Sequence, residues 1–310
     1  MTSHFLRNFL RLLFAASLAL SGCTSASVSI NTPQAFKVLV VESFLADIVQ
    51  HVAGQRIQVE TLIPLGMDPH TYQPTPQDVA RIAESQMLIV NGAHFEEWLA
   101  KSLENAGMHG PVIEASSGLI SRKPGADEVI DPGHVGDPHF WLDPNNVIKY
   151  VENIRDGLVA ADPGGKSEYS SNAAAYIVQL QELDVWIQSK VAQIPSENRL
   201  LVTNHESFGY FADRYGFSIA GTVIPSTSSE ASPSARQMAE LIDRIRQTGA
   251  KAIFLESGAN SQLADQIAQE SGAKVVTDLY THSVTAANGA APGYIEMIKH
   301  NVDLIVAALK

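Results

Sequence analysis

From residue 36 onward the sequence alternates short β-branched runs with helical patterns, and it does so in two series. The strand-like runs of the first series are KVLVVES, RIQVETLI, MLIVNG and PVIEA, and those of the second are RLLVTN, FSIAGTVI, AKAIFLES and AKVVTDLY. Strands that alternate with helices form parallel sheets covered by those helices. The pattern therefore predicts an α/β protein with two Rossmann-like lobes, each built on a parallel sheet.

One long helical stretch, KSEYSSNAAAYIVQLQELDVWIQSKVAQIP, separates the two series. Its apolar residues recur mostly at helical spacing, and no glycine interrupts them. A single helix of about 25 residues would be nearly 40 Å long at a rise of about 1.5 Å per residue. We therefore expect an N-terminal lobe over 36–163, one long rigid connecting helix within 164–194 and a C-terminal lobe over 195–310.

The first 35 residues have the composition of an export signal followed by a tether. Arg7 and Arg11 precede an apolar run over 12–20 that is too short to span a bilayer. The run ends in Leu-Ser-Gly-Cys, which resembles a bacterial lipobox, and Cys23 is the only cysteine of the chain. We expect a lipoprotein signal peptide over 1–22, lipidation of Cys23 and a tether over 23–35. An ordinary cleaved signal with an incidental cysteine is the alternative.

The composition limits the kinds of partner and of metal site. A hydrophobic fraction of 45% and a charged fraction of 17% are ordinary for a soluble globular protein. The formal net charge of −12 argues against a sequence-independent grip on nucleic acid and favours a cationic ligand. A single cysteine excludes an intramolecular disulfide and a site made of several thiolates. Any transition-metal site must then be built from imidazole and carboxylate groups.

Four histidines follow predicted strands at or beyond their carboxyl ends: His70, His139, His205 and His282. These ends meet at the same edge of a parallel sheet. Two of the four come from each lobe, so a cleft between the lobes could present all of them to one ion. The sequence therefore indicates a four-histidine metal site.

The other six histidines do not share this placement. His4 lies in the export signal, and His51 and His300 lie within predicted helices. We expect the last three, His94, His109 and His134, to be exposed in or near loops.

Four segments carry a family resemblance that extends over 36–310. MDPHTYQPTPQD, DPHFWLDP, TNHESFGYFADRYG and the closing LYTHSVT…GYIEMIKHNVDLI resemble the signature segments of the zinc- and manganese-binding solute receptors of bacterial ABC importers, the cluster A-I lipoproteins. The resemblance implies that His70, His139 and His205 are metal ligands. It also implies an extracytoplasmic, lipid-anchored monomer of the adhesin-like type that delivers its ion to an ABC permease and its ATPase subunit.

The sequence departs from the family pattern at the fourth ligand. The family usually carries an aspartate or glutamate just after the last strand, whereas this sequence aligns His282 there and carries Asp278 four residues earlier. We favour His282, because it is in register and imidazole is a competent ligand. Asp278 or a water molecule could instead complete the shell.

The ligand types favour zinc over manganese as the bound ion. Neutral imidazoles suit tetrahedral zinc, while manganese prefers more carboxylate oxygen. Manganese-selective members of the family often carry glutamate at the position of His205. Zinc members frequently carry a histidine-rich loop before the second ligand motif, and this chain has only His134 there. Zinc is therefore the expected ion and manganese the alternative.

The rival function is that of a zinc hydrolase, with Glu206 or Glu256 as the general base. Such an enzyme keeps an open, water-bearing position on its zinc. The sequence contains neither an HExxH nor a GxSxG motif. A fourth protein ligand would leave no easy position for the reacting water, so we expect a receptor rather than an enzyme.

Overall fold

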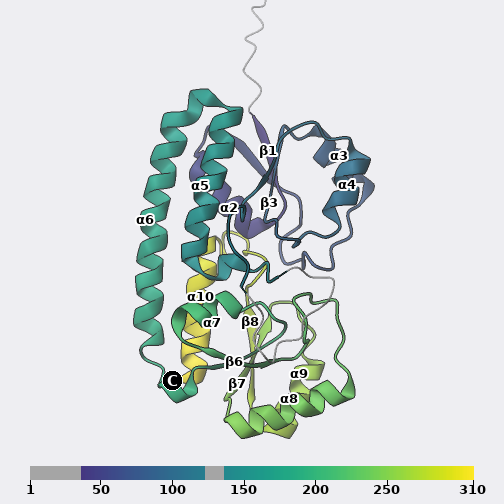
Figure 1. Cartoon of the computed structure of the whole chain (residues 1–310), viewed down its shortest axis with the longest axis vertical. Coiled ribbons are helices and arrows are strands. Elements are labelled where there is room, and N and C mark those ends of the chain that lie inside the picture. The colour runs from purple at the N-terminus through teal and green to yellow at the C-terminus, as the bar shows by residue number, and fades with distance from the viewer. Residues whose placement is uncertain (1–35, 123–135) are drawn as a thin grey trace, which may run out of the picture. The chain divides into compact units, whose positions relative to one another are not determined.

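The computed structural model describes residues 36–122 and 136–310 (Figure 1). The predicted signal peptide over 1–22, Cys23, the tether over 23–35 and His134 lie outside these residues, so the expectations for them stay predictions. The described residues belong to one compact unit, Ala35–Lys310. None of the helices within the two described ranges is long and apolar enough to cross a membrane.

The first sheet has four parallel strands in the order β2-β1-β3-β4. Helices alternate with its strands, and local sequence fixes their ends: Thr75 and Asp78 form a reciprocal capping box before α3, and Gly107 ends α4 in the left-handed conformation. The elements are β1 (Lys37–Val40), α2 (Ser43–Ala53), β2 (Gln58–Thr61), α3 (Pro76–Glu84), β3 (Met87–Val90), α4 (Leu99–Ala106) and β4 (Val112–Glu114).

The second sheet repeats this topology with the order β6-β5-β7-β8, again all parallel. In both sheets the first and third strands occupy the centre. The elements are β5 (Leu200–Thr203), α7 (Gly209–Tyr215), β6 (Ser218–Thr222), α8 (Ala235–Thr248), β7 (Ala252–Glu256), α9 (Gln262–Ser271), β8 (Lys274–Leu279) and α10 (Tyr294–Leu309). The N-terminal lobe is built on the first sheet and the C-terminal lobe on the second.

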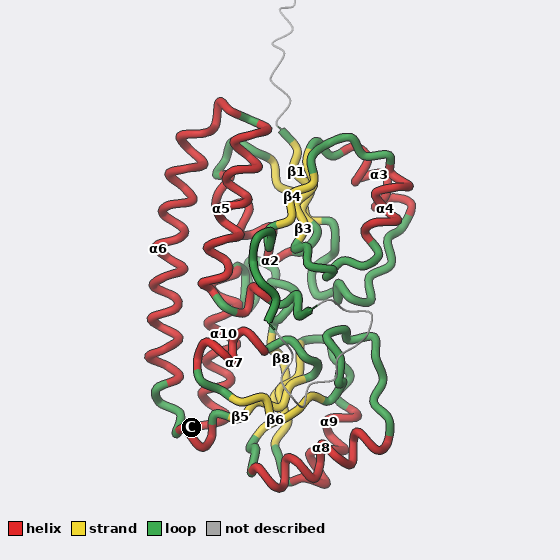
Figure 2. The backbone as a smooth tube through the Cα atoms, in the orientation of Figure 1, coloured by secondary structure: helices red, strands yellow, loops and turns green. Residues whose placement is uncertain are grey.

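Two long helices join the lobes. Helix α5 (Pro144–Ala161) leads through a 3₁₀ turn, Pro163–Gly165, into α6 (Lys166–Val191). Helix α6 has 26 residues and would be about 39 Å long. It runs along one side of both lobes, whereas α3, α4, α8 and α9 lie on the other side (Figure 1). The tube view shows the two sheets separated in space and linked by these helices (Figure 2). The predicted fold class is confirmed, and α6 falls within the expected connector.

The largest hydrophobic core runs through both lobes. It takes side chains from both sheets and from α2, α5, α6 and α10, and the last helix packs against both α6 and α2. Successive residues of a strand point to opposite faces, so Val38 enters this shared core while Leu39 enters a separate outer core of the N-terminal lobe. In the C-terminal lobe Leu201 likewise enters the shared core, and Val202 enters a separate outer core. The lobes are therefore fused along the α6 side.

Candidate metal site

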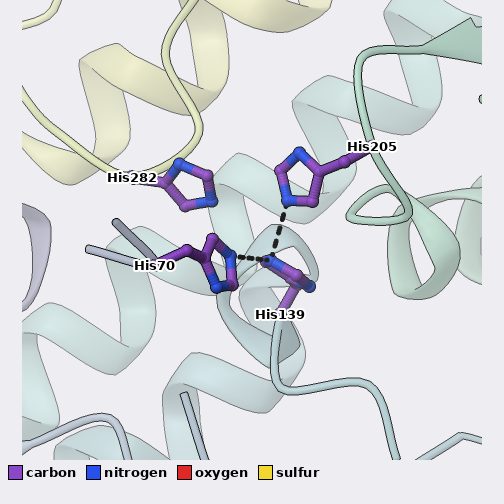
Figure 3. A group of neighbouring side chains, drawn as sticks. All are labelled: His70, His139, His205 and His282. Carbon is purple, nitrogen blue, oxygen red and sulfur yellow. Dashed lines mark hydrogen bonds between the residues drawn. The ribbon is translucent and has the colours of Figure 1, made fainter. Parts of the chain in front are cut away.

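The four predicted histidines lie in loops that follow the elements of the two sheets. His70 lies in a turn between β2 and α3, and His139 directly precedes a 3₁₀ turn, Phe140–Leu142. His205 follows β5, which ends at Thr203, and His282 follows β8, which ends at Leu279. The structure brings all four side chains together, two from each lobe (Figure 3).

The imidazole rings converge on a common centre. One ring nitrogen from each histidine lies within 4.8 Å of the other three. The Nε2 atom of His139 lies 3.3 Å from that of His70 and 3.2 Å from that of His205. Four nitrogens placed tetrahedrally at about 2.0 to 2.1 Å from zinc would be about 3.3 to 3.4 Å apart. These two spacings are close to that range.

The four histidines differ in how deeply their side chains are buried. The side chains of His139 and His205 are fully buried, that of His282 is almost so, and His70 is partly exposed. The Nε2 atom of His282 is buried and has no hydrogen-bond partner. A buried polar atom without a partner is costly, and a metal ligand is one role that removes the cost.

Two of the four histidines end the same tripeptide, Asp-Pro-His, which covers residues 68–70 and 137–139 and forms the same local turn in both places. The backbone N–H of His70 donates to Asp68 Oδ1 at 2.9 Å, and that of His139 donates to Asp137 Oδ1 at 2.9 Å. Short side chains of aspartate commonly accept a bond from the backbone two residues onward. The turn therefore fixes the backbone of each histidine independently of the contacts that its ring makes.

Carboxylates stand behind the two fully buried rings. The Nδ1 atom of His139 donates to Asp137 Oδ1 at 2.8 Å, and Nδ1 of His205 lies 2.7 Å from Glu256 Oε1. An ionised carboxylate only accepts, so it holds the proton on Nδ1 and leaves the lone pair of Nε2 facing the centre. Glu256 also approaches Nδ1 of His282, at 3.6 Å. The rings are thereby oriented for coordination.

These neighbours shift the pKa values of the buried groups in different directions. Burial opposes the charged form of His205, but the adjacent Glu256 carboxylate raises the pKa of this imidazole. Burial lowers the pKa of His282, which outweighs the opposite influence of Glu256 and Asp68. Burial alone would raise the pKa of Glu256, but the two imidazoles lower it to about 2. Glu256 is therefore a carboxylate throughout the neutral range.

Two aromatic rings flank the cluster. The centroid of Phe95 lies 4.8 Å from that of His70, and the centroid of Trp141 lies 5.2 Å from that of His139. Both aromatic side chains are almost fully buried. Such a wall lowers the local dielectric and strengthens the contacts between the rings and their carboxylates.

A pair of buried acids supports the loop that carries Phe95. Glu96 accepts bonds from the backbone N–H groups of Asn91 at 2.6 Å and Gly92 at 3.1 Å. The Asn91 side chain in turn donates to the carbonyl of Pro138 at 3.2 Å, one residue before His139. Burial next to Glu96 raises the pKa of Glu42 well above its ordinary value. Burial also raises the pKa of Glu96, so the environment of this pair opposes two buried charges.

The structure places the remaining candidates away from the cluster. Asp278 is exposed at the end of β8, where its carboxylate accepts a bond from the Thr277 hydroxyl at 2.9 Å. His94 and His109 are exposed, as expected. His51 and His300 lie in α2 and α10, as expected, and Nε2 of His300 lies 3.0 Å from the carbonyl of Asp278.

A cavity of about 690 Å³ adjoins the cluster between the lobes. Its wall includes Asp68 from the N-terminal lobe and Ser229, Glu256 and His282 from the C-terminal lobe. The cavity therefore reaches His282 and Asp68. His139 and His205 are not part of its wall.

Comparison with known proteins identifies the family of this site. The family model described as "Zinc-uptake complex component A periplasmic" matches residues 38–308. The chain belongs to this family. As a member it is a metal-binding solute receptor of an ABC importer and not an enzyme, which excludes the hydrolase alternative.

Similar proteins include receptors for both candidate ions. The manganese-binding lipoprotein MntA of Halalkalibacterium halodurans is 34% identical over 298 residues, 96% of each chain. A manganese-bound periplasmic metal-binding protein from Candidatus Liberibacter asiaticus has a TM-score of 0.78 at 29% identity, covering 88% of this chain and 99% of that one. The periplasmic zinc-binding protein TroA of Treponema pallidum has a TM-score of 0.78 at 28% identity, covering 88% and 98%.

Sequence reasoning about this family member missed the carboxylates and aromatic rings around the histidines. Asp68 and Asp137 had a visible signal, because each stands two residues before a ligand candidate with proline between. Glu256 was considered only as the base of a hydrolase, although its place at the end of β7 is where a strand-end group can reach His205. Phe95 and Trp141 had no local signal.

Proposed function

We propose that the protein captures one divalent transition-metal ion with His70, His139, His205 and His282 and delivers it to the permease of an ABC importer. The observation that carries this proposal is the convergence of four ring nitrogens within 4.8 Å. The donor set fits such a cargo because neutral imidazole is a strong ligand for divalent transition metals. The carboxylates behind the rings favour the tautomer that coordinates through Nε2.

Zinc is the cargo that the donor set favours. The four clustered donors are nitrogens, and the nearby carboxylates of Asp137 and Glu256 contact the Nδ1 atoms of the rings. Manganese prefers oxygen ligands and a higher coordination number than four. MntA is named for manganese, and its kinship keeps manganese as the alternative cargo.

His282 rather than Asp278 is our choice for the fourth ligand. His282 is nearly buried and shares the cluster with the other three histidines. Asp278 is exposed, and its carboxylate bonds to its own neighbour Thr277. A ligand role for Asp278 would require the end of β8 to turn towards the cleft.

The remaining parts of the proposal concern where the receptor works. A lipid on Cys23 would hold it at the outer face of a membrane, with 23–35 as a flexible tether. The receptor would act as a monomer and present both lobes, 36–163 and 195–310, to the permease and its ATPase partner.

Metal titration tests the proposal. Purified protein stripped of metal should bind one equivalent of zinc, and it should prefer zinc to manganese in direct competition. Copper and nickel also bind nitrogen donors strongly, so the metal content of protein purified from its own host decides the cargo. An Asp278→Ala variant should retain zinc. Zinc binding that survives loss of His282 but not of Asp278 would contradict the assignment, and host protein loaded with manganese would contradict zinc as the cargo.

A further inference from the structure

One carboxylate joins the two lobes directly beside the histidine cluster. Asp68 Oδ1 accepts the backbone bond from His70 and lies 3.9 Å from Nδ1 of His282. Asp68 Oδ2 accepts a hydrogen bond from the hydroxyl of Ser229. Asp68 and His70 belong to the N-terminal lobe, and Ser229 and His282 belong to the C-terminal lobe. The contact therefore ties one ligand loop to the opposite lobe.

Asp137 shows that the turn itself does not require this second contact. It forms the same turn with His139, but its Oδ1 also accepts from the ring of that histidine. Asp68 directs its second oxygen across the lobe boundary instead. Two identical tripeptides thus have different partners, and the Asp68 carboxylate accepts a hydrogen bond from a side chain of the opposite lobe.

The loop that carries Ser229 is connected to another ligand. The backbone N–H of Ser228 donates to Ser226 Oγ at 3.0 Å, and the carbonyl of Ser226 accepts from the backbone N–H of Glu206 at 2.9 Å. Glu206 directly follows His205. A movement of Ser229 away from Asp68 would therefore accompany a movement of the His205 loop away from His70.

A second bond reinforces the closure between the same loops. The backbone N–H of Gly66 donates to Ser283 Oγ at 2.8 Å, and Ser283 directly follows His282. The loop over 66–70 is thus attached to the C-terminal lobe at two points, Ser229 and Ser283. Both points lie in the wall of the cavity.

We propose that the hydrogen bond between Asp68 and Ser229 is a latch that sets how fast the captured ion leaves the receptor. The inference rests on the function proposed above. Asp68 is a positioning residue here, because it acts through the backbone of His70 and through the lobe contact rather than on the ion. Its side chain is 31% exposed, so water from the cavity can compete for the bond and open it.

Removal of the Ser229 hydroxyl tests the latch. Zinc is loaded onto full-length protein and its release into excess chelator is followed by stopped flow, with zinc association measured separately. Ser229→Ala should release zinc about three- to tenfold faster, the effect expected for one partly exposed bond to a carboxylate. Association should stay within about twofold, because the latch closes after the ion has entered.

Two further serine variants make the test specific. Ser232→Ala makes the same chemical change three residues along the loop, where the side chain is exposed, and it should release zinc at the wild-type rate. Ser229→Thr keeps the hydroxyl and should restore slow release. The thermal midpoint of the metal-free protein should not separate Ser229→Ala from Ser232→Ala.

Each outcome decides one question. Equal release from wild type and Ser229→Ala, with stoichiometric zinc in both, would overturn the latch and leave the receptor function intact. Equal acceleration in Ser232→Ala would overturn it as well, because the effect would then belong to the loop in general. Failure of the wild-type protein to bind zinc would instead refute the proposed zinc receptor itself.

Discussion

The two Asp-Pro-His segments, 68–70 and 137–139, form the same turn in different surroundings. In both, the aspartate accepts the backbone N–H of the histidine at 2.9 Å. His139 is fully buried and its own aspartate holds its ring, whereas His70 is partly exposed and its aspartate contacts the opposite lobe. The shared turn positions a histidine that we propose as a ligand. The environment of the turn then decides whether the aspartate stabilises one ring or the closed arrangement of the lobes.

The largest expected difference between the segments comes from removing the rings. His139→Ala should weaken zinc binding by about a hundredfold or more, because the Nε2 atom of His139 lies next to those of both His70 and His205. His70→Ala should cost about tenfold. Affinities are measured by chelator competition, with exposed His109→Ala as the unchanged control. A greater loss for His70→Ala would reverse the ranking of the two segments.

Replacing Asp137 should weaken zinc binding more than replacing Asp68, in the same order as for His139 and His70. Asp137→Asn weakens the acceptor behind the His139 ring and should cost about ten- to a hundredfold in zinc affinity, the usual range for such partners. Asp68→Asn keeps an oxygen for the His70 backbone and should cost less than tenfold, mainly through faster release. Both are measured by the same competition assay combined with release kinetics. If both variants lost the same zinc affinity and released zinc at the same rate, the two aspartates would have the same role.

The four imidazoles, including the His282 ring that Asp68 faces across the lobes, should set the pH dependence of zinc affinity. Zinc binds neutral imidazole, so affinity should fall as pH drops through the ordinary histidine range near 6.5. The logarithm of affinity should approach a limiting slope of four per pH unit, one for each ring; the raised pKa of His205 makes its proton compete at higher pH, and the lowered pKa of His282 makes its proton compete only at lower pH. His282→Asp should reduce that slope by about one and shift preference towards manganese, whereas Asp278→Ala should change neither. Competition titrations between pH 5 and 8 measure the slope, and a wild-type slope near three would favour a three-histidine shell.

The smallest effect on the site should come from the predicted anchor. Cys23→Ser should leave zinc affinity unchanged, since the cysteine precedes the receptor domain by a predicted tether. The protein should move from the membrane fraction to the soluble fraction, as followed by immunoblotting after fractionation. Persistence in the membrane fraction would argue against lipidation of Cys23.

Much of this architecture follows from local sequence. The alternation of β-branched runs with helical patterns predicted both parallel sheets, and the stretch without glycine over 166–191 predicted α6. The four histidines could be placed because the carboxyl ends of parallel strands share an edge. These features depend on the order and type of elements, which neighbouring residues largely determine.

The contacts around the rings could not be predicted in the same way. Asp68 and Asp137 stand in the same tripeptide, and only the tertiary surroundings send one to Ser229 and the other to a ring. Glu42 stands directly before α2, where an acidic residue is ordinary, yet the fold buries it beside Glu96. Ser229 and Glu96 lie tens of residues from Asp68 and Glu42, so no local pattern contains these two contacts.

The core shared by both lobes has a consequence for how the chain is made. Helix α10 consists of the final residues, Tyr294–Leu309, yet it packs against α2 and α6, and the Tyr294 hydroxyl bonds to the carbonyl of Trp141 at 2.6 Å. During synthesis the core shared by the two lobes therefore cannot be completed until the last helix has been made. A chain cut short before Tyr294 would expose the apolar faces of α2 and α6 to chaperones and proteases, although every strand and every histidine of the cluster would already be present.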